Sequence, residues 1–178
     1  NLLAKWNKAY NLTAITQPEE MLIKHLLDSL AVAPFIEAGE LLDVGSGAGL
    51  PSIPLAILLP DLQVTSLDSN GKKTRFQFQA KTELGLKNFN VEQARVEQTE
   101  LNLTSKQLIS RAFASLINFV ELTANLAAPQ AKWLAMKGLY PQEELNTLPQ
   151  EFKCLASHQL KVPFLYEQRH LIILGKEE

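Results

Sequence analysis

The chain has 178 residues, of which 46% are hydrophobic, and this size and composition suit one globular domain with a full core. Seventeen Lys and Arg against 19 Asp and Glu give a formal net charge of −2, which excludes bulk electrostatic attraction to nucleic acid or to an anionic membrane. A polyanionic partner would therefore have to bind a local basic patch.

The cysteine content and the lack of long apolar runs restrict the class of protein further. Cys154 is the single cysteine, which excludes an internal disulfide and fits a reducing compartment. No apolar run approaches the roughly 18 residues of a transmembrane helix, and no secretory signal pattern is present. We expect a cytoplasmic protein without membrane contact. His158 and His170 lack metal-ligand spacing, so no metal site is predicted.

Residues 1–39 are expected to form an N-terminal helical attachment. A short leading helix carries Leu3 and Trp6, and a polar elbow follows at 11–13. A second helix begins at Pro18, where two acidic residues favour the positive end of the helix dipole, and its apolar residues recur at helical spacing until Pro34.

From residue 40 onward, strand and helix signals alternate, which indicates a core over 40–178 within a single domain of residues 1–178. The predicted strands are 41–44, 63–68, 90–94, 108–112 and 132–137, and the predicted helices are 51–59, 72–84, 117–127 and 141–148. The last two strands, near 154–162 and 170–175, have no helix between them and should form an antiparallel hairpin. The fold class is α/β, with a doubly wound, mostly parallel sheet covered by helices on both faces.

The stretch LLDVGSGAGLPSIPLA, residues 41–56, lies where such sheets bind ligands, after the first strand. Its glycines alternate as G-x-G-x-G, and Leu50 stands where a dinucleotide fingerprint would need glycine. The chain also has no phosphate-binding P-loop sequence. An acid at Asp43 followed by this spacing favours a compact zwitterion as ligand; the alternative is that the glycines only allow tight strand-to-helix packing.

Asp68 ends the second predicted strand, so its carboxylate should face the glycine loop. A carboxylate there can accept hydrogen bonds from both hydroxyls of a ribose, and Val96 and Glu97 after the third strand could flank an adenine. Two alternatives stay open. Asp68 could cap the helix that starts near Asn70, and Glu97 could be an ordinary solvated acid.

Several stretches together resemble the glucose-inhibited division protein B family, the bacterial methyltransferases of guanine N7 in small-subunit ribosomal RNA. The family commonly has Gly where this chain has Ser52. The matching segments span nearly the whole chain: KWNKAYNLTAI (5–15), HLLDSLAVAPF (25–35), DVGSGAGLPSIPLAI (43–57), LLPDLQVTSLDSNGKKTRF (58–76), RVEQ (95–98), SRAFASL (110–116) and MKG (136–138).

The resemblance implies a class I methyltransferase (Rossmann-like) fold and S-adenosylmethionine as methyl donor. It places the ribose at Asp68, and Arg111 at the donor's amino-acid end or at the acceptor; the alternative for Arg111 is an ion pair with Asp43 or Asp68. His25 and Asn11 match the family's N-terminal motifs, and a structural role for His25 is an equal alternative. The residues expected to contact the donor are Gly45, Ser46, Gly47, Leu50, Asp68, Val96, Glu97 and Arg111.

Methyl transfer to guanine N7 needs no general base, because N7 has a lone pair and carries no proton. We therefore predict no certain catalytic acid or base, and only Arg111 and Lys137 as positioning candidates.

Cys154 is not in a Pro-Cys dipeptide and is expected in the core. RNA contacts are expected from Lys72, Lys73, Arg75 and Lys137; the alternative is a solvated helix face.

The implied activity is S-adenosylmethionine-dependent methylation of N7 of a specific guanine in 16S ribosomal RNA. The substrate would be this RNA or the ribosomal particle, and the protein is expected to be a monomer. Two alternatives remain: the same fold methylating a small molecule, or a non-catalytic module that binds the donor and assists ribosome assembly.

Overall fold

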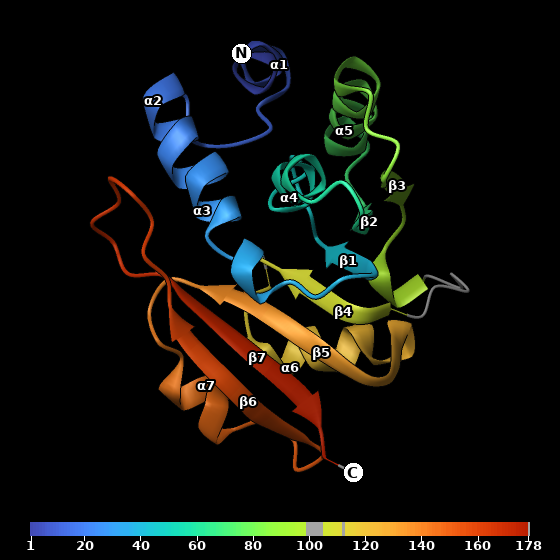
Figure 1. Cartoon of the computed structure of the whole chain (residues 1–178), viewed down its shortest axis with the longest axis vertical. Helices are drawn as coiled ribbons and strands as arrows, with labels where there is room; N and C mark the ends of the chain where they lie inside the picture. The colour runs from blue at the N-terminus through green and yellow to red at the C-terminus, as the bar shows by residue number, and fades with distance from the viewer. Residues whose placement is uncertain (99–104, 112, 178) are drawn as a thin grey trace.

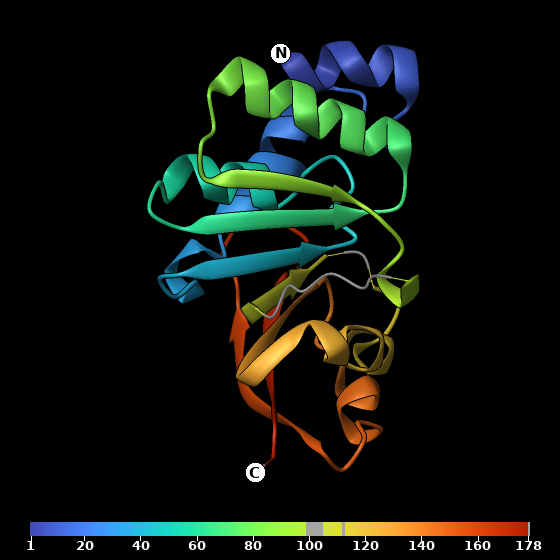
Figure 2. The ribbon, with the colours of Figure 1, turned by 90° about the vertical axis from the view of Figure 1, so that its right-hand side faces the viewer.

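The computed structural model describes residues 1–98, 105–111 and 113–177, and its centre is one mixed sheet. The strand order is β3-β2-β1-β4-β5-β7-β6; the first five strands are parallel, and β7 is antiparallel to both β5 and β6. Figure 2 shows β1, β2 and β3 pointing the same way. The strands are β1 (Glu40–Val44), β2 (Gln63–Asp68), β3 (Phe89–Gln93), β4 (Ser105–Ser110), β5 (Ala127–Lys137), β6 (Phe152–Gln159) and β7 (His170–Lys176).

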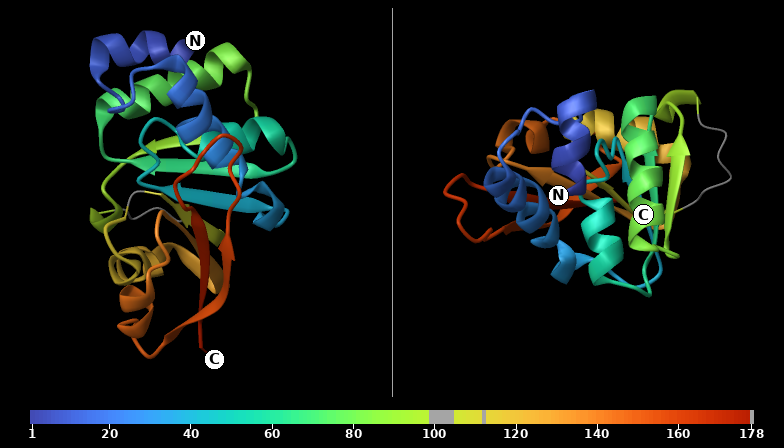
Figure 3. Two further views of the ribbon diagram at one scale, coloured as in Figure 1. Left: turned by 90° about the vertical axis from the view of Figure 1, so that its left-hand side faces the viewer. Right: turned by 90° about the horizontal axis from the view of Figure 1, so that it is seen from above.

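Helices cover both faces of this sheet (Figures 1 and 3). One face carries α1 (Leu2–Tyr10), α2 (Pro18–Met21), the π-helical turn Leu22–Leu27, α3 (Asp28–Leu30), the 3-10 turn Ala33–Phe35, α4 (Ser52–Leu58) and α5 (Gly71–Leu84). The other carries α6 (Leu116–Thr123), with the 3-10 turn Ala124–Leu126, and α7 (Gln142–Asn146). A further 3-10 turn, Val96–Gln98, follows β3.

Alternation along the strands divides the core into two layers. In β1, Leu41 points into the layer that contains Phe76 of α5, whereas Leu42 and Val44 point into the layer that contains Phe119 of α6. Both faces of the strand are therefore apolar, as expected of a parallel strand buried on two sides.

The predicted fold class is confirmed, and β2 has the predicted bounds. The largest difference is β5, which begins five residues before the prediction, at Ala127. Its first residues are partly exposed and have no apolar pattern, so only the pairing of Ser105 with Ala127 reveals that part of the strand. β4 likewise begins at Ser105, and Ala112, the last residue of the predicted fourth strand, lies outside the described residues.

The expectation that Cys154 lies in the core is wrong, because its side chain is exposed. Cys154 is on β6, the edge strand of the sheet, most of whose residues are exposed or half-buried. An edge strand with few covered positions does not need an apolar pattern.

The two last strands bring a distant loop to the edge of the sheet where ligand binding is predicted. Since β5 and β6 are both antiparallel to β7, the carboxyl ends of β6 and β1–β5 share one edge of the sheet. The loop 160–169 between β6 and β7 therefore lies at that edge, beside α3 (Figures 1 and 3). Within the described ranges, no helix has both the length and the apolarity that a membrane crossing requires.

Candidate functional site

The loop between β1 and α4 holds its shape through three glycines with positive φ. The φ angles are 71° at Gly45, 60° at Gly47 and 74° at Gly49, all in the left-handed region that side chains disfavour. At Gly49 a Cβ atom would also collide with the side chain of Ile53. Tight strand-to-helix packing, the alternative reason for the glycines, therefore accounts for Gly49, which allows α4 to approach the loop closely.

Asp68, at the end of β2, binds this loop directly. Its Oδ2 accepts a hydrogen bond from the backbone N–H of Gly47 at 2.7 Å, and its Oδ1 accepts one from the N–H of Asn70 at 2.8 Å. Asn70, not Asp68, caps α5, because its side chain accepts hydrogen bonds from the first turn of that helix. The half-buried carboxylate keeps lone pairs on both oxygens for a ligand.

Gln77 of α5 forms hydrogen bonds with the glycine loop, and sequence reasoning did not predict it. Its Nε2 donates to the carbonyl oxygen of Gly47 at 2.7 Å and to Oγ of Ser46 at 2.9 Å, and its Oε1 accepts from Ser66. Gln77 is fully buried. The sequence feature that could have indicated it is an amide side chain directly after Phe76, on the buried face of the helix.

Asp43 is buried beneath the loop and does not line a described cavity there. Its Oδ2 accepts a hydrogen bond from the backbone N–H of Ser52, the first residue of α4, at 3.2 Å. Burial raises the pKa of Asp43 to about 7, an effect that the hydrogen bond from the Ser52 backbone N–H partly opposes. Asp43 thus fixes the start of α4 rather than facing a ligand.

Two adjoining cavities lie at this edge, and Gly45 borders both. The first, of about 260 Å³, runs between the ends of β2 and β3, and the second, of about 160 Å³, lies between the glycine loop and the N-terminal segment. Each residue predicted to contact the donor lines one of them. Gly45, Asp68, Val96 and Glu97 line the first, and Gly45, Ser46, Gly47, Leu50 and Arg111 line the second.

His25 lines the second cavity with both ring nitrogens occupied. The carbonyl oxygen of Lys24 lies 3.1 Å from Nδ1 and can only accept, so Nδ1 carries the proton. Nε2 then accepts from the Thr13 hydroxyl at 2.8 Å. Burial, together with the nearby Arg111 charge, lowers the pKa of His25, which keeps the ring neutral. These contacts favour the structural role. Asn11, also matched to the family, is the exposed C-cap of α1.

The four predicted RNA-binding cations occupy different environments. Lys72 and Arg75 are exposed on α5, whereas Lys73 is half-buried and lines the second cavity. Lys137, at the end of β5, has a side chain only 14% exposed and forms an ion pair with Glu144 at 2.9 Å. Lys72 and Arg75 are therefore the members of this set best placed to meet a polyanion.

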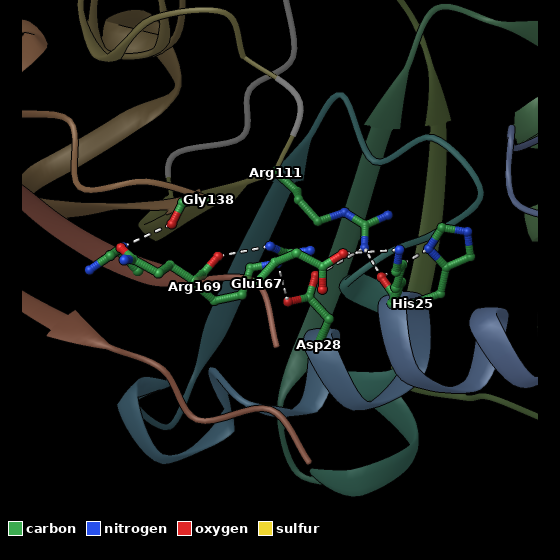
Figure 4. Close-up of polar contacts among 9 residues, drawn as sticks. His25, Asp28, Arg111, Gly138, Glu167 and Arg169 are labelled. Atoms are coloured by element: carbon green, nitrogen blue, oxygen red, sulfur yellow. Dashed lines mark hydrogen bonds and ion pairs between the residues drawn. The ribbon is translucent and has the colours of Figure 1, made fainter. Parts of the chain in front are cut away.

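Arg111, directly after β4, pairs with an acid that the sequence analysis did not consider. Its Nη1 lies 3.4 Å from Oδ2 of Asp28, so the alternative of a pair with Asp43 or Asp68 is wrong. Arg169 approaches the other oxygen of the same carboxylate, with Nε 3.1 Å from Oδ1 (Figure 4). Sequence reasoning thus missed Asp28, which pairs with the cavity-lining Arg111, and its second partner Arg169.

Comparison with known proteins identifies the family of the chain. The family model described as rRNA small subunit methyltransferase G (GidB) matches residues 1–172. The chain belongs to this family. Proteins named "Ribosomal RNA small subunit methyltransferase G" are similar to it: that of Pseudomonas fluorescens (strain Pf0-1) is 56% identical over 175 residues, and that of Pseudomonas aeruginosa (strain LESB58) is 53% identical over 176. Each alignment covers 98% of this chain and 82% of the relative.

Solved structures with lower identity share the fold. TrmN from Thermus thermophilus has a TM-score of 0.66 at 17% identity, covering 84% of this chain and 47% of that one. A SAM dependent methyltransferase from Aquifex aeolicus has a TM-score of 0.64 at 16% identity, covering 92% and 96%. The fold is therefore that of methyltransferases. Across the described residues, no cluster of three or more His, Cys, Asp or Glu side chains could hold a metal ion.

Proposed function

We propose that this member of the rRNA small subunit methyltransferase G family transfers a methyl group from S-adenosylmethionine to N7 of a guanine in 16S ribosomal RNA. The observation that carries the proposal is the contact between Asp68 and Gly47. It holds a carboxylate with available lone pairs against the glycine loop, at the point where the two cavities meet. The family match and the names of the relatives support the RNA substrate.

The residues present fit an adenosyl methyl donor. Asp68 can accept hydrogen bonds from vicinal ribose hydroxyls, and Val96 and Glu97 line the same cavity at the position expected for the adenine. Arg111 and Lys73 bring positive charge to the second cavity, which suits the carboxylate of an amino-acid group. When bound, the donor supplies a sulfonium methyl group.

This chain's own residues contribute binding and orientation rather than proton transfer. Guanine N7 has no proton to remove, and His25, the histidine that lines these cavities, has both nitrogens committed to Thr13 and Lys24. Holding two reactants in line can contribute about 7 to 11 kcal/mol in favourable cases, so orientation is the main contribution expected from these residues.

Exposed Lys72 and Arg75 would bind phosphates beside the donor cavities, which gives a protein of net charge −2 a local basic patch. A small-subunit RNA substrate would place the reaction in the cytoplasm. These residues stand at the start of α5, which follows Asp68 by only a few positions.

The test is transfer of labelled methyl from S-adenosylmethionine to small-subunit particles from cells that lack this enzyme. Cleavage specific for N7-methylguanine, mapped by reverse-transcription stops, would locate the product. We expect one new stop in 16S ribosomal RNA. Label in small metabolites would favour the small-molecule alternative, and donor binding without any transfer would favour the assembly module.

A further inference from the structure

A third cavity, of about 360 Å³, adjoins the second one and shares His25 and Arg111 with it. It lies between the helix containing Asp28, the end of β5 and the loop before β7, from which Arg169 enters. Its volume falls within the range of about 300 to 1,000 Å³ usual for small-molecule sites. The three cavities thus form a row along the carboxyl edge of the sheet.

Asp28 organises this third cavity. Its side chain is only 4% exposed, and its two oxygens are divided between two arginines, with Arg169 Nε at 3.1 Å and Arg111 Nη1 at 3.4 Å. The side chains of Arg111 and Arg169 are 26% and 23% exposed. Each arginine therefore pairs with the buried Asp28 and still reaches the surface of the cavity. A shared carboxylate fixes the separation of the two guanidinium groups.

The guanidinium groups have further donors available for a ligand. Among the described residues, Arg111 donates through Nη1, and Arg169 donates through Nε and Nη1. Nη2 of each arginine therefore has hydrogens with no hydrogen-bond partner in the described part of the chain. A ligand that offers a carbonyl oxygen could accept from them.

The charges around the cavity select a neutral ligand over a phosphate. Its other two cationic residues, Lys24 and Lys137, are also paired, with Glu167 at 3.1 Å and with Glu144 at 2.9 Å. Because every one of these cations already pairs with a carboxylate, little net positive charge is left to bind a phosphate dianion. A neutral base does not need that charge, and the nearby acids would stabilise the positive charge that methylation leaves on its ring.

We propose that this third cavity receives the target guanine base and that Asp28 is a positioning residue, holding Arg111 and Arg169 so that they donate to the guanine O6. The inference rests on the proposed function and adds the location of the acceptor. With O6 bound by guanidinium nitrogens, the adjacent N7 faces the second cavity, from which the methyl group comes. The new bond forms between N7 and the methyl carbon, while the electrons of the sulfur–carbon bond stay on sulfur, leaving it neutral.

The test compares Asp28→Asn with the matched control Asp61→Asn, an exposed acid before β2 at the opposite edge of the sheet. Donor affinity is measured by calorimetry, and methyl transfer to unmethylated small-subunit particles is measured in single turnover at saturating donor. For Asp28→Asn we expect a transfer rate at saturating donor lowered between about 10- and 100-fold, beyond any change in donor Kd that the release of Arg111 causes, because misplacing positioning groups by about 1 Å costs rate on this scale. Asp28→Glu, which keeps the charge, should restore part of the rate.

A double-mutant cycle separates positioning from a general structural role. If Asp28 acts by holding Arg169, Arg169→Gln lowers the rate similarly, and the double variant is no slower than the slower single variant. Rate losses that multiply, an unchanged rate in Asp28→Asn, or a loss confined to donor Kd would overturn the inference. If Asp28→Asn does not fold, the variant Arg169→Gln, at a partly exposed position, tests the inference by the same two measurements.

The outcomes for the two proposals are distinguishable. If the unsubstituted chain leaves N7 unmethylated, the proposed function is overturned as well. If the unsubstituted chain and the variant are both fully active, only this inference is overturned.

Discussion

Oδ2 of Asp68 lies 2.7 Å from the backbone nitrogen of Gly47, so the last residue of β2 fixes the loop that follows β1. The same carboxylate accepts from the N–H of Asn70, the cap of α5. One side chain thus joins the glycine loop, the end of a strand and the start of a helix at the proposed ribose position.

Replacing Asp68 by alanine should weaken donor binding by about 2 to 4 kcal/mol, because charge-assisted hydrogen bonds to the ribose are lost and the loop loses its anchor. Titration calorimetry with S-adenosylmethionine measures the change. Asp61→Ala, which removes an exposed acid elsewhere, should bind the donor as the unsubstituted chain does. Equal affinity in both variants would remove Asp68 from the donor site.

Gln77→Met should lower the free energy of unfolding by about 1 to 3 kcal/mol and also reduce donor affinity, because Ser66 and the Gly47 carbonyl lose a buried partner. Chemical denaturation and calorimetry measure the two effects. The control is Gln79→Met on the same helix, where the amide donates to the exposed Glu83. If donor affinity persists in Gln77→Met, the amide supports the fold but not the loop conformation.

Neutralising Lys72 and Arg75 together should weaken RNA binding and reduce the slope of log affinity against log salt concentration by about 1 to 2, since two phosphate contacts would be lost. Donor affinity should not change. Lys73→Gln should instead reduce donor affinity, because Lys73 lines the second cavity. Lys87→Gln, an exposed lysine just before β3, serves as the control. If the slope of log affinity against log salt concentration is the same in the double variant and the unsubstituted chain, Lys72 and Arg75 belong to a solvated helix face.

The pKa of Asp43 predicts a pH-dependent stability. The folded chain keeps the proton of this carboxyl up to about pH 7, whereas the unfolded chain releases it near 3.8. Between these values the folded state binds more protons, so the free energy of unfolding should fall as pH rises, by up to about 4 kcal/mol, and level off above pH 7. Denaturation of Asp43→Asn across this range should lack that fall. Identical pH profiles for both chains would show that Asp43 ionises normally.

The residues predicted to contact the donor line the first two cavities because their positions follow directly from topology. Once parallel strands are recognised, the ends of β1, β2 and β3 must share an edge, which brings Gly45, Asp68 and Val96 together. The spacing of residues along the chain contains that information. The bounds of β2 were predicted from its flanks, since Gln63–Asp68 lies between a proline-ended helix and a polar turn.

The contacts missed were those that join distant parts of the chain. Asp28 and Arg169 are 141 positions apart, and no local pattern links an acid on a helix to an arginine in a late loop. Gln77 was missed because helical spacing shows which face is buried but not what a buried amide meets across the interface. Cys154 was misplaced since its residue type favours burial, whereas an edge strand leaves it exposed.

The antiparallel pair β6–β7 determines when each part of the site can be completed during synthesis. All described residues that line the first two cavities lie within the first 113 positions, whereas the third cavity needs Arg169 from just before the final strand. The residues of the first two cavities are therefore all translated while the C-terminal residues are still missing. The chain gains Arg169, the second arginine that pairs with Asp28, only when translation is nearly finished.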